Sequence, residues 1–351
     1  MTIAPKLPHK SMLNRMQGIM VLAVLLCWVL PTSWATAEVH PSFLYKLSDF
    51  DGPIPFKSAR IFVDNQRNET YIADTRLAEI RIFNSRGMEV YRFGDDGSLN
   101  NMLDMVVSKK GEILVLARQA DQPVILRCDF RGRLLETLNL KNLPPAYLAI
   151  RPSKMAYWND QLYLLDAIAL KVVVTSTDGL FQKGYDIAHL IALDDKKRKE
   201  TEIVGFSVDP HGNILFTIPV MFAAFRLSPD GEILSFGHPG SAPGRFGVVV
   251  AIVADAQGYY YIADRLKSVV LIFNPQLKFQ TEFGYRGRQP HNLISPGELG
   301  LDTKGRLYIA QLGYRGVSVF KITHPQDGDP SNSQVEISGS QSKGGDKPIN
   351  Q

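Results

Sequence analysis

One phrase recurs along this chain at a nearly constant spacing. The stretch "VDNQRNETYIADTRLAEIRIFN" at 63–84 is repeated, with small changes, as "ADAQGYYYIADRLKSVVLIFN" at 254–274. Looser versions lie between the two copies and after the second, so that equivalent positions follow one another at intervals of about 47 residues. The positions equivalent to Asp74 are Arg118, Asp166, Ile218, Asp264 and Gln311. A steady period of this length indicates stacked structural units, and it predicts six of them.

Each unit has the pattern of four short β-strands. Its apolar residues alternate with polar ones or form short β-branched runs, and glycine or aspartate turns separate these runs. The 3.6-residue apolar stripe that a helical repeat requires is absent from the sequence. Four antiparallel strands per unit make one blade of a propeller. We therefore predict an all-β fold, a six-bladed β-propeller of four-stranded antiparallel blades.

The sixth unit is incomplete, because its strand pattern stops after the third strand, near Ile322. The segment "FLYKLSDFDG" at 43–52 resembles the outer-strand phrases "EVYRFGDDG" and "QTEFGYRG" of other units. We expect this N-terminal strand to supply the missing fourth strand and so close the ring. Closure of this kind pairs an edge that would otherwise be exposed.

The units resemble NHL repeats. The resemblance is clearest in three units: the first ("IFVD…YIADTRLAEIRIFNSRG…RFG"), the fifth ("IVADAQGYYYIADRLKSVVLIFN…EFG") and the sixth ("GLDTKGRLYIAQ…VSVF"). The other three units keep the spacing but match the motif at fewer positions. The resemblance covers nearly all of the chain between its two ends. It implies a six-bladed propeller, a fold that amidating lyases and lactonases also use, with metal ligands around the central channel.

The two ends of the chain differ in composition from the repeats. Residues 1–37 combine a basic start, the apolar run "GIMVLAVLLCWVL" and a small-x-small ending at Ala37, which predicts a cleaved Sec-type signal peptide. The apolar run is too short for the roughly twenty residues of a membrane anchor. A lipoprotein modified at Cys27 is the other alternative, although Leu26 stands where a small residue is expected. Residues 325–351 are too polar and too rich in Gly, Ser and Pro to form a core, which predicts a disordered tail.

These ends set the expected location and partners. We expect a monomeric propeller at 38–324, periplasmic, secreted or on the cell surface, with no stable membrane insertion after cleavage. Removal of the leader takes away three positive charges and no acidic residue, so the formal charge of +4 falls to about +1. This small charge disfavours nucleic acid as a partner. Only Cys128 remains after cleavage, which excludes an intramolecular disulfide.

Several repeated or apolar positions have structural explanations. An aspartate precedes the first turn of four units, at Asp64, Asp209, Asp255 and Asp302, where a carboxylate can accept bonds from backbone amides. A second set, Asp74, Asp166 and Asp264, ends the second strand, where we expect it to order the next loop. Cys128 occupies a position that is phenylalanine in other units, so an inert buried thiol is expected.

The sequence offers only weak candidates for catalysis. No G-x-S-x-G elbow, H-E-x-x-H helix or Walker loop occurs. His238 and His291 lie in equivalent connectors of neighbouring units, with Asp264 as a possible oxygen ligand of a metal. A metal-assisted lyase or hydrolase at the central channel is therefore the alternative function. Solvated loop histidines are the other interpretation, and no cofactor is expected.

Loops that share one face of the ring carry basic and aromatic residues together. Arginine beside tyrosine is typical of recognition surfaces, although ordinary solvated loops can have the same composition. We predict a non-catalytic scaffold that binds a protein or peptide through this face, and the long connector at 189–205 is a short exposed helix or a docking element. The candidate residues are Arg76, Arg118, Lys171, Arg265, Lys267, Tyr285, Arg286, Arg288, Tyr314 and Arg315.

Overall fold

A computed structural model describes residues 39–94, 97 and 99–324 of the chain. The expected signal peptide at 1–37 and the expected tail at 325–351 lie outside the described residues. No helix within the described ranges has both the length and the apolar character needed to cross a bilayer.

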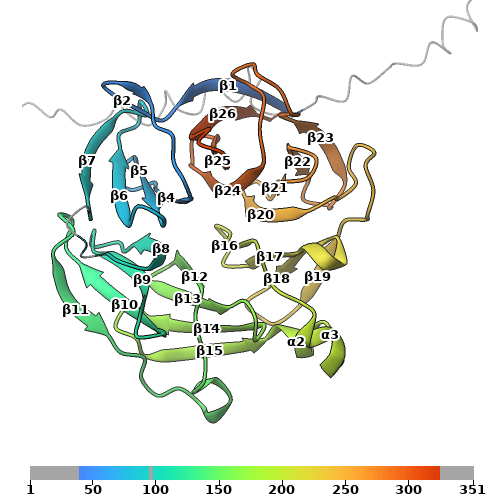
Figure 1. The fold of residues 1–351 in the computed structure, drawn as a ribbon. Helices are drawn as coiled ribbons and strands as arrows, with labels where there is room; N and C mark the ends of the chain where they lie inside the picture. Colours follow the sequence, from blue (N-terminus) through green and yellow to red (C-terminus); the bar gives the residue numbers. More distant parts are fainter. Residues whose placement is uncertain (1–38, 95–96, 98, 325–351) are drawn as a thin grey trace, which may run out of the picture. The chain divides into compact units, whose positions relative to one another are not determined.

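The described residues form six four-stranded antiparallel sheets, and a separate two-stranded hairpin joins the sixth sheet to the first. Figure 1 shows the six sheets around a common centre. The first three blades follow the chain in order. Blade 1 has β4 (Ala59–Asp64), β5 (Glu69–Asp74), β6 (Glu79–Phe83) and β7 (Glu89–Phe93); blade 2 has β8 (Met102–Val107), β9 (Ile113–Gln119), β10 (Gln122–Cys128) and β11 (Leu134–Leu138); blade 3 has β12 (Lys154–Trp158), β13 (Gln161–Asp166), β14 (Lys171–Ser176) and β15 (Phe181–Asp186).

The last three blades complete the ring. Blade 4 has β16 (Phe206–Val208), β17 (Ile214–Ile218), β18 (Ala223–Leu227) and β19 (Ile233–Phe236); blade 5 has β20 (Val249–Ala254), β21 (Tyr260–Asp264), β22 (Val269–Phe273) and β23 (Phe279–Phe283); blade 6 has β24 (Pro296–Leu301), β25 (Arg306–Gln311), β26 (Val317–Thr323) and β1 (His40–Lys46). The first strand of each of blades 1 to 6 lies innermost and the fourth outermost (Figure 1). The six-bladed all-β prediction is confirmed.

The N-terminal strand closes the ring as predicted. β1 pairs antiparallel with β26, with His40 opposite Thr323 and Lys46 opposite Ser318. The Phe43 ring packs edge-on against Phe320, at 5.6 Å between ring centres. The strand covers residues 40–46, so the second half of the predicted segment does not extend it. Residues 48–53 form instead the two-residue strands β2 (Ser48–Asp49) and β3 (Gly52–Pro53).

The connector from blade 3 to blade 4 contains two short helices instead of one. These are α2 (Ile187–Leu190) and α3 (Asp195–Lys199), and the side chains of Asp186 and Asp194 cap their N-termini. Two short 3-10 turns, Pro145–Tyr147 and Pro219–Met221, lie in other loops. α2 contributes the buried Ile187 and Ala188, whereas α3 has no buried residue.

The repeated aspartates brace the loops, as the sequence predicted. Asp209 Oδ1 accepts bonds from the amides of His211 and Asn213 in the first turn of blade 4. At the end of the second strand, Asp264 accepts from the amides of Gly247, Val248 and Lys267. This carboxylate therefore joins the connector that enters blade 5 to the next loop of the same blade.

The core lies between neighbouring sheets, where β-branched and aromatic side chains from adjacent blades pack together. Cys128 is part of the cluster between blades 1 and 2 and is 1% exposed. Burial raises the pKa of its thiol to about 11, and Asp129 adds to the effect. A thiol with this pKa is almost entirely protonated at neutral pH, which agrees with the predicted inert role.

Candidate functional site

A layer of charged side chains crosses the channel at the centre of the ring. The layer comes from a position near the start of each inner strand. This position is opposite Ala73 in blade 1, Leu116 in blade 2, Leu165 in blade 3 and Ala310 in blade 6. In the order of the blades, this position holds Arg60, Asp104, Lys154, Gly205, Ala251 and Glu298. Charged residues therefore come from blades 1, 2, 3 and 6, and small residues from blades 4 and 5.

Glu298 connects the two cations of the layer. Its Oε2 atom is 2.6 Å from Arg60 Nη1, on the neighbouring blade, and 3.5 Å from Lys154 Nζ, which comes from the opposite side of the ring. Desolvation opposes ionisation of Glu298, but the charges of Lys154 and Arg60 outweigh it and lower the pKa of Glu298. Lys154 is itself desolvated, and this burial lowers the pKa of its ammonium group.

Asp104 is the second acidic group of the layer, and backbone amides hold it in place. Oδ1 accepts from the Met105 amide at 2.9 Å and Oδ2 from the Met155 amide at 2.8 Å. Burial raises the pKa of Asp104, even though Arg60 and Lys154 act in the opposite direction. The carboxyl group therefore neutralises less positive charge than a freely ionised aspartate at the surface.

A cavity of about 230 Å³ lies at one end of the charged layer. We call it the loop-end cavity, because loops and blade connectors line it together with the first residues of inner strands. Its wall includes Arg60 and Lys154 of the layer and Arg265 from the loop after β21. The remaining lining residues are Ser153, Ala167, Glu202, Ile203, Val204, Val250 and Gly297.

Arg265 is the least compensated charge of this cavity. Its Nε atom is buried and has no hydrogen-bond partner among the described residues. Desolvation lowers the pKa of Arg265, and the nearby charge of Arg60 lowers it further. The wall of the loop-end cavity therefore has three cations and one acidic residue, the exposed Glu202.

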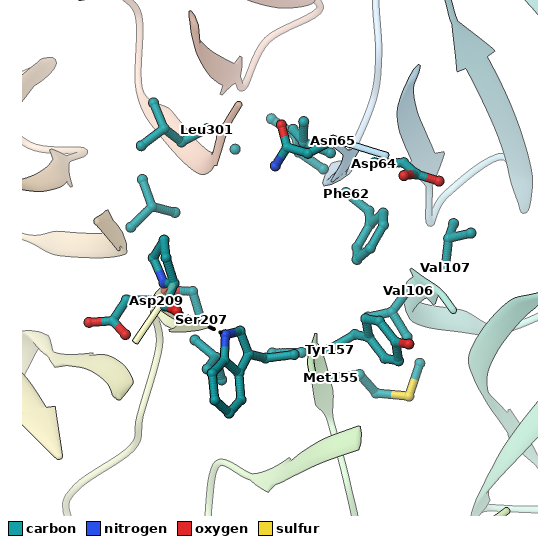
Figure 2. A pocket seen from close by; sticks show the side chains of 18 of the residues that line it. Phe62, Asp64, Asn65, Val106, Val107, Met155, Tyr157, Ser207, Asp209 and Leu301 are labelled. Atoms are coloured by element: carbon teal, nitrogen blue, oxygen red, sulfur yellow. Dashed lines mark hydrogen bonds between the residues drawn. The ribbon is translucent and has the colours of Figure 1, made fainter. Parts of the chain in front are cut away.

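A larger cavity, of about 600 Å³, lies at the other end of the channel, and we call it the turn-end cavity. All six inner strands contribute to its wall, together with turns that follow them in every blade except blade 5, and the wall combines apolar and polar side chains. Figure 2 shows Phe62, Met155, Tyr157 and Leu301 around its open centre. Asp104 and Glu298 also line this cavity, so it meets the acidic side of the charged layer.

The loop face has exposed apolar residues next to basic ones. We use this name for the loops between second and third strands together with the connectors between blades, which the alternating strand directions bring to one end of the ring. Leu266 is 72% exposed and follows Arg265, while Ile168 is 78% exposed and lies near Lys171. The other large exposed apolar residues of these loops and connectors are Phe50, Leu77, Leu148, Val220, Met221, Phe222, Tyr285, Leu312 and Tyr314.

The structure divides the ten predicted face residues into two groups. Six are exposed and four are partly buried. The exposed residues are Arg76, Arg118, Tyr285, Arg286, Arg288 and Tyr314, and the partly buried ones are Lys171, Arg265, Lys267 and Arg315.

Two of the partly buried lysines have partners inside the protein. Lys267 Nζ is 2.7 Å from Glu282 Oε2 and also donates to the backbone carbonyls of Ala242 and Arg245. Lys171 Nζ donates to the carbonyl of Ala146 at 2.7 Å. Glu282 therefore neutralises Lys267, whereas Lys171 is held by a backbone carbonyl and keeps its charge without an acidic partner among the described residues.

The proposed metal ligands are not brought together as a site. Asp264 is fully buried and its oxygens already accept three backbone amides, whereas His238 and His291 are exposed. Within the described ranges, no group of three or more His, Cys, Asp or Glu side chains has an arrangement that could hold a metal ion.

The charged layer was not predicted from the sequence. The sequence feature that marks it is a charged residue near the start of four inner strands, where the other two units have a small residue. A fixed number of residues before each Asp74-equivalent position does not identify these charged residues, because the turn between the first and second strands differs in length from blade to blade. Blade 3 turns between Trp158 and Gln161, while blade 1 turns between Asp64 and Glu69.

Solved structures with similar folds include both enzymes and a binding protein. Virginiamycin B lyase from Staphylococcus aureus matches with a TM-score of 0.51 at 13% identity, over 79% of this chain and 86% of the lyase. A gluconolactonase from Xanthomonas campestris matches with a TM-score of 0.53 at 13% identity, over 83% of this chain and 93% of that protein. An auxiliary nutrient binding protein from Bacteroides ovatus matches with a TM-score of 0.55 at 16% identity, over 82% and 77%.

These similarities establish the fold class, a six-bladed β-propeller, and leave the chemistry open. No protein-family profile matches the chain, and no curated protein sequence matches it.

Proposed function

We propose that this chain is an exported NHL-type propeller that binds a protein or peptide partner through its loop face. The observation that carries the proposal is the pairing of exposed apolar and basic side chains in loops of this face, such as Arg76 with Leu77 and Arg286 with Tyr285. Soluble monomeric proteins rarely expose many large apolar side chains on one face. Their position on one face favours a role in binding.

The composition of the face indicates the chemistry of the partner. Arg76, Arg286 and Arg288 are exposed, and no acidic side chain of the described residues pairs with them. An acidic partner would complement these charges, and its apolar side chains would cover Leu266 and Ile168. Arginine and tyrosine are enriched at protein interfaces, which favours an acidic peptide or protein over a lipid surface.

Charge reversal of the exposed arginines tests this proposal. The triple variant Arg76→Glu, Arg286→Glu and Arg288→Glu is expected to bind labelled peptides of mixed Glu and Leu residues about ten-fold or more weakly. Fluorescence polarisation at constant salt measures the affinities. The matched control is Lys110→Glu, Lys278→Glu and Lys304→Glu, which reverses three exposed charges in turns at the opposite end of the blades.

The control variant is expected to bind like the unmodified protein, and both variants are expected to keep its melting temperature. Equal binding by the two triple variants, or no peptide binding by the unmodified protein, would overturn the proposal. If the protein instead co-sediments with anionic phospholipid vesicles and binds no peptide, its partner is a membrane surface. That result would also overturn the proposal.

A metal-assisted lyase or hydrolase is the second candidate, and the similarity to lyase and lactonase folds is the observation in its favour. Because His238 and His291 are exposed and Asp264 is engaged with backbone amides, we expect His238→Ala with His291→Ala to leave the bound-metal content unchanged. Elemental analysis of the purified protein measures this content. A stoichiometric metal that is lost in the double variant would support the enzyme instead.

A further inference from the structure

We propose that the loop-end cavity binds a small anion with a carboxylate or phosphate group, through Arg60, Lys154 and Arg265. This inference is independent of the loop-face partner, because its site lies inside the channel. It stands on the placement of three cationic side chains in the wall of one cavity of about 230 Å³.

One of the three cations of the site has no carboxylate partner. Arg60 and Lys154 share one carboxylate, Glu298, and Arg265 makes no ion pair within the described part of the chain. Asp104 adds at most one further negative charge, and burial disfavours its ionisation. Glu202 also lines the cavity, but it is exposed to solvent and forms no ion pair with the three cations within the described residues. Arg265 is therefore a partly buried cation without a carboxylate partner. Burying an unpaired charge is costly, and an anionic ligand would remove part of that cost.

The three cations have different roles toward such a ligand. Arg60 and Lys154 are held in the channel wall by Glu298, so their positions are fixed before a ligand arrives. Arg265 comes from a loop and its guanidinium group has no hydrogen bond within the described ranges. Guanidinium groups match the oxygens of carboxylate and phosphate in a fork geometry, so Arg265 is the group with donors to offer.

The small residues of the layer add no further charge beside the cavity. Gly205 and Ala251 occupy the positions that carry charged side chains in the other four blades. A Cβ atom at Gly205 would lie 2.7 Å from Thr217 Oγ1 and 2.9 Å from the Ala251 Cα atom, so the backbones of blades 4 and 5 approach closely here. The cavity is several times larger than the roughly 30 Å³ that a water molecule occupies in the liquid. It therefore has room for a small organic acid or a phosphate group.

Calorimetric titration tests the site with inorganic phosphate and with acetate as separate probes, at constant ionic strength set by sodium chloride. The full-length mature protein is expected to bind at least one of the probes, and the tighter one identifies the preferred oxyanion. Arg265→Ala is expected to weaken that binding about ten-fold, because it removes the unpaired guanidinium group. Arg118→Ala removes an exposed arginine of the loop face outside the cavity, and it is expected to bind like the unmodified protein.

A second variant keeps the result informative if Arg265→Ala proves unstable. Glu298→Gln removes the ionised carboxylate of the layer and keeps its shape, so it is expected to bind the same anion more tightly. Circular dichroism verifies that each variant is folded. Failure of both probes to bind the unmodified protein, or unchanged affinity in folded Arg265→Ala, would overturn the anion site. Neither outcome changes the peptide-binding test, because the variants in that test leave the cavity intact.

Discussion

Replacing Glu298 by alanine is expected to lower the free energy of unfolding by about 3 kcal/mol. The side chain is 14% exposed, and it is the carboxylate that pairs with both Arg60 and Lys154 across the channel. Its removal leaves two cations in a desolvated layer without their partner. Guanidinium chloride unfolding, followed by circular dichroism, measures the change.

Glu202→Ala is the matched control for this experiment. Glu202 lines the same end of the channel, but it is exposed and makes no ion pair within the described ranges, so its replacement is expected to change the free energy by less than about 0.5 kcal/mol. A Glu298→Ala protein as stable as this control would show that the layer contributes no net stability.

The stability difference also has an expected pH dependence. The pKa of Glu298 is lowered in the folded protein from its ordinary value of 4.5. The ionised side chain therefore contributes stability above that pH, and the contribution is lost as the pH falls through the folded-state pKa. The difference between the unmodified protein and Glu298→Ala should accordingly become smaller in acid.

Phe43→Ala is expected to lower the free energy of unfolding by about 2 kcal/mol, because Phe43 fastens the closing strand to Phe320. Leu44→Ala is the matched control in the same strand. Leu44 is 43% exposed, so its replacement is expected to cost less than about 0.5 kcal/mol. Equal effects of the two changes would show that the Phe43 contact does not hold the ring closed.

A shorter chain provides a stronger form of the same test. Removal of residues 38–46 would leave β26 as an unpaired edge, and exposed edges associate with other chains. Size-exclusion chromatography is expected to show oligomers or aggregate for this chain and a monomer for Leu44→Ala. A monomeric truncated protein with an unchanged melting temperature would contradict this role of β1.

The repeat predicted the fold well because every unit imposes the same strand and turn pattern. The YIAD phrases predicted the second strand of blades 1 and 5, and the equivalent positions predicted it in the other blades. Asp74, Asp166 and Asp264 at the ends of these strands were correctly expected to order loops. The closing strand was identified by its likeness to other outer strands. The length of this strand was not predicted correctly. β1 runs antiparallel to β26, so it ends at Lys46, where its partner β26 begins at Val317.

The sequence pattern could not predict which side chains line the central channel or which charged residues form ion pairs. The sequence places Lys267 in a loop of the binding face, but Glu282, a residue of the outer strand β23, neutralises it. Lys154 and Glu298 come from opposite sides of the ring, so their pairing depends on the width of the channel and not on local spacing. Loop periodicity could place Arg265 on the correct face, but not in the wall of a cavity.

The pairing of β1 with β26 also sets an order of events during synthesis. The first strand of the described chain leaves the ribosome before any blade exists, and its partner is made only after every other blade. Contacts between such distant segments form slowly, since a long loop must close first. A nascent chain that stalls before residue 317 would therefore expose its N-terminal strand without a pairing partner. That strand could bind chaperones or a second nascent chain.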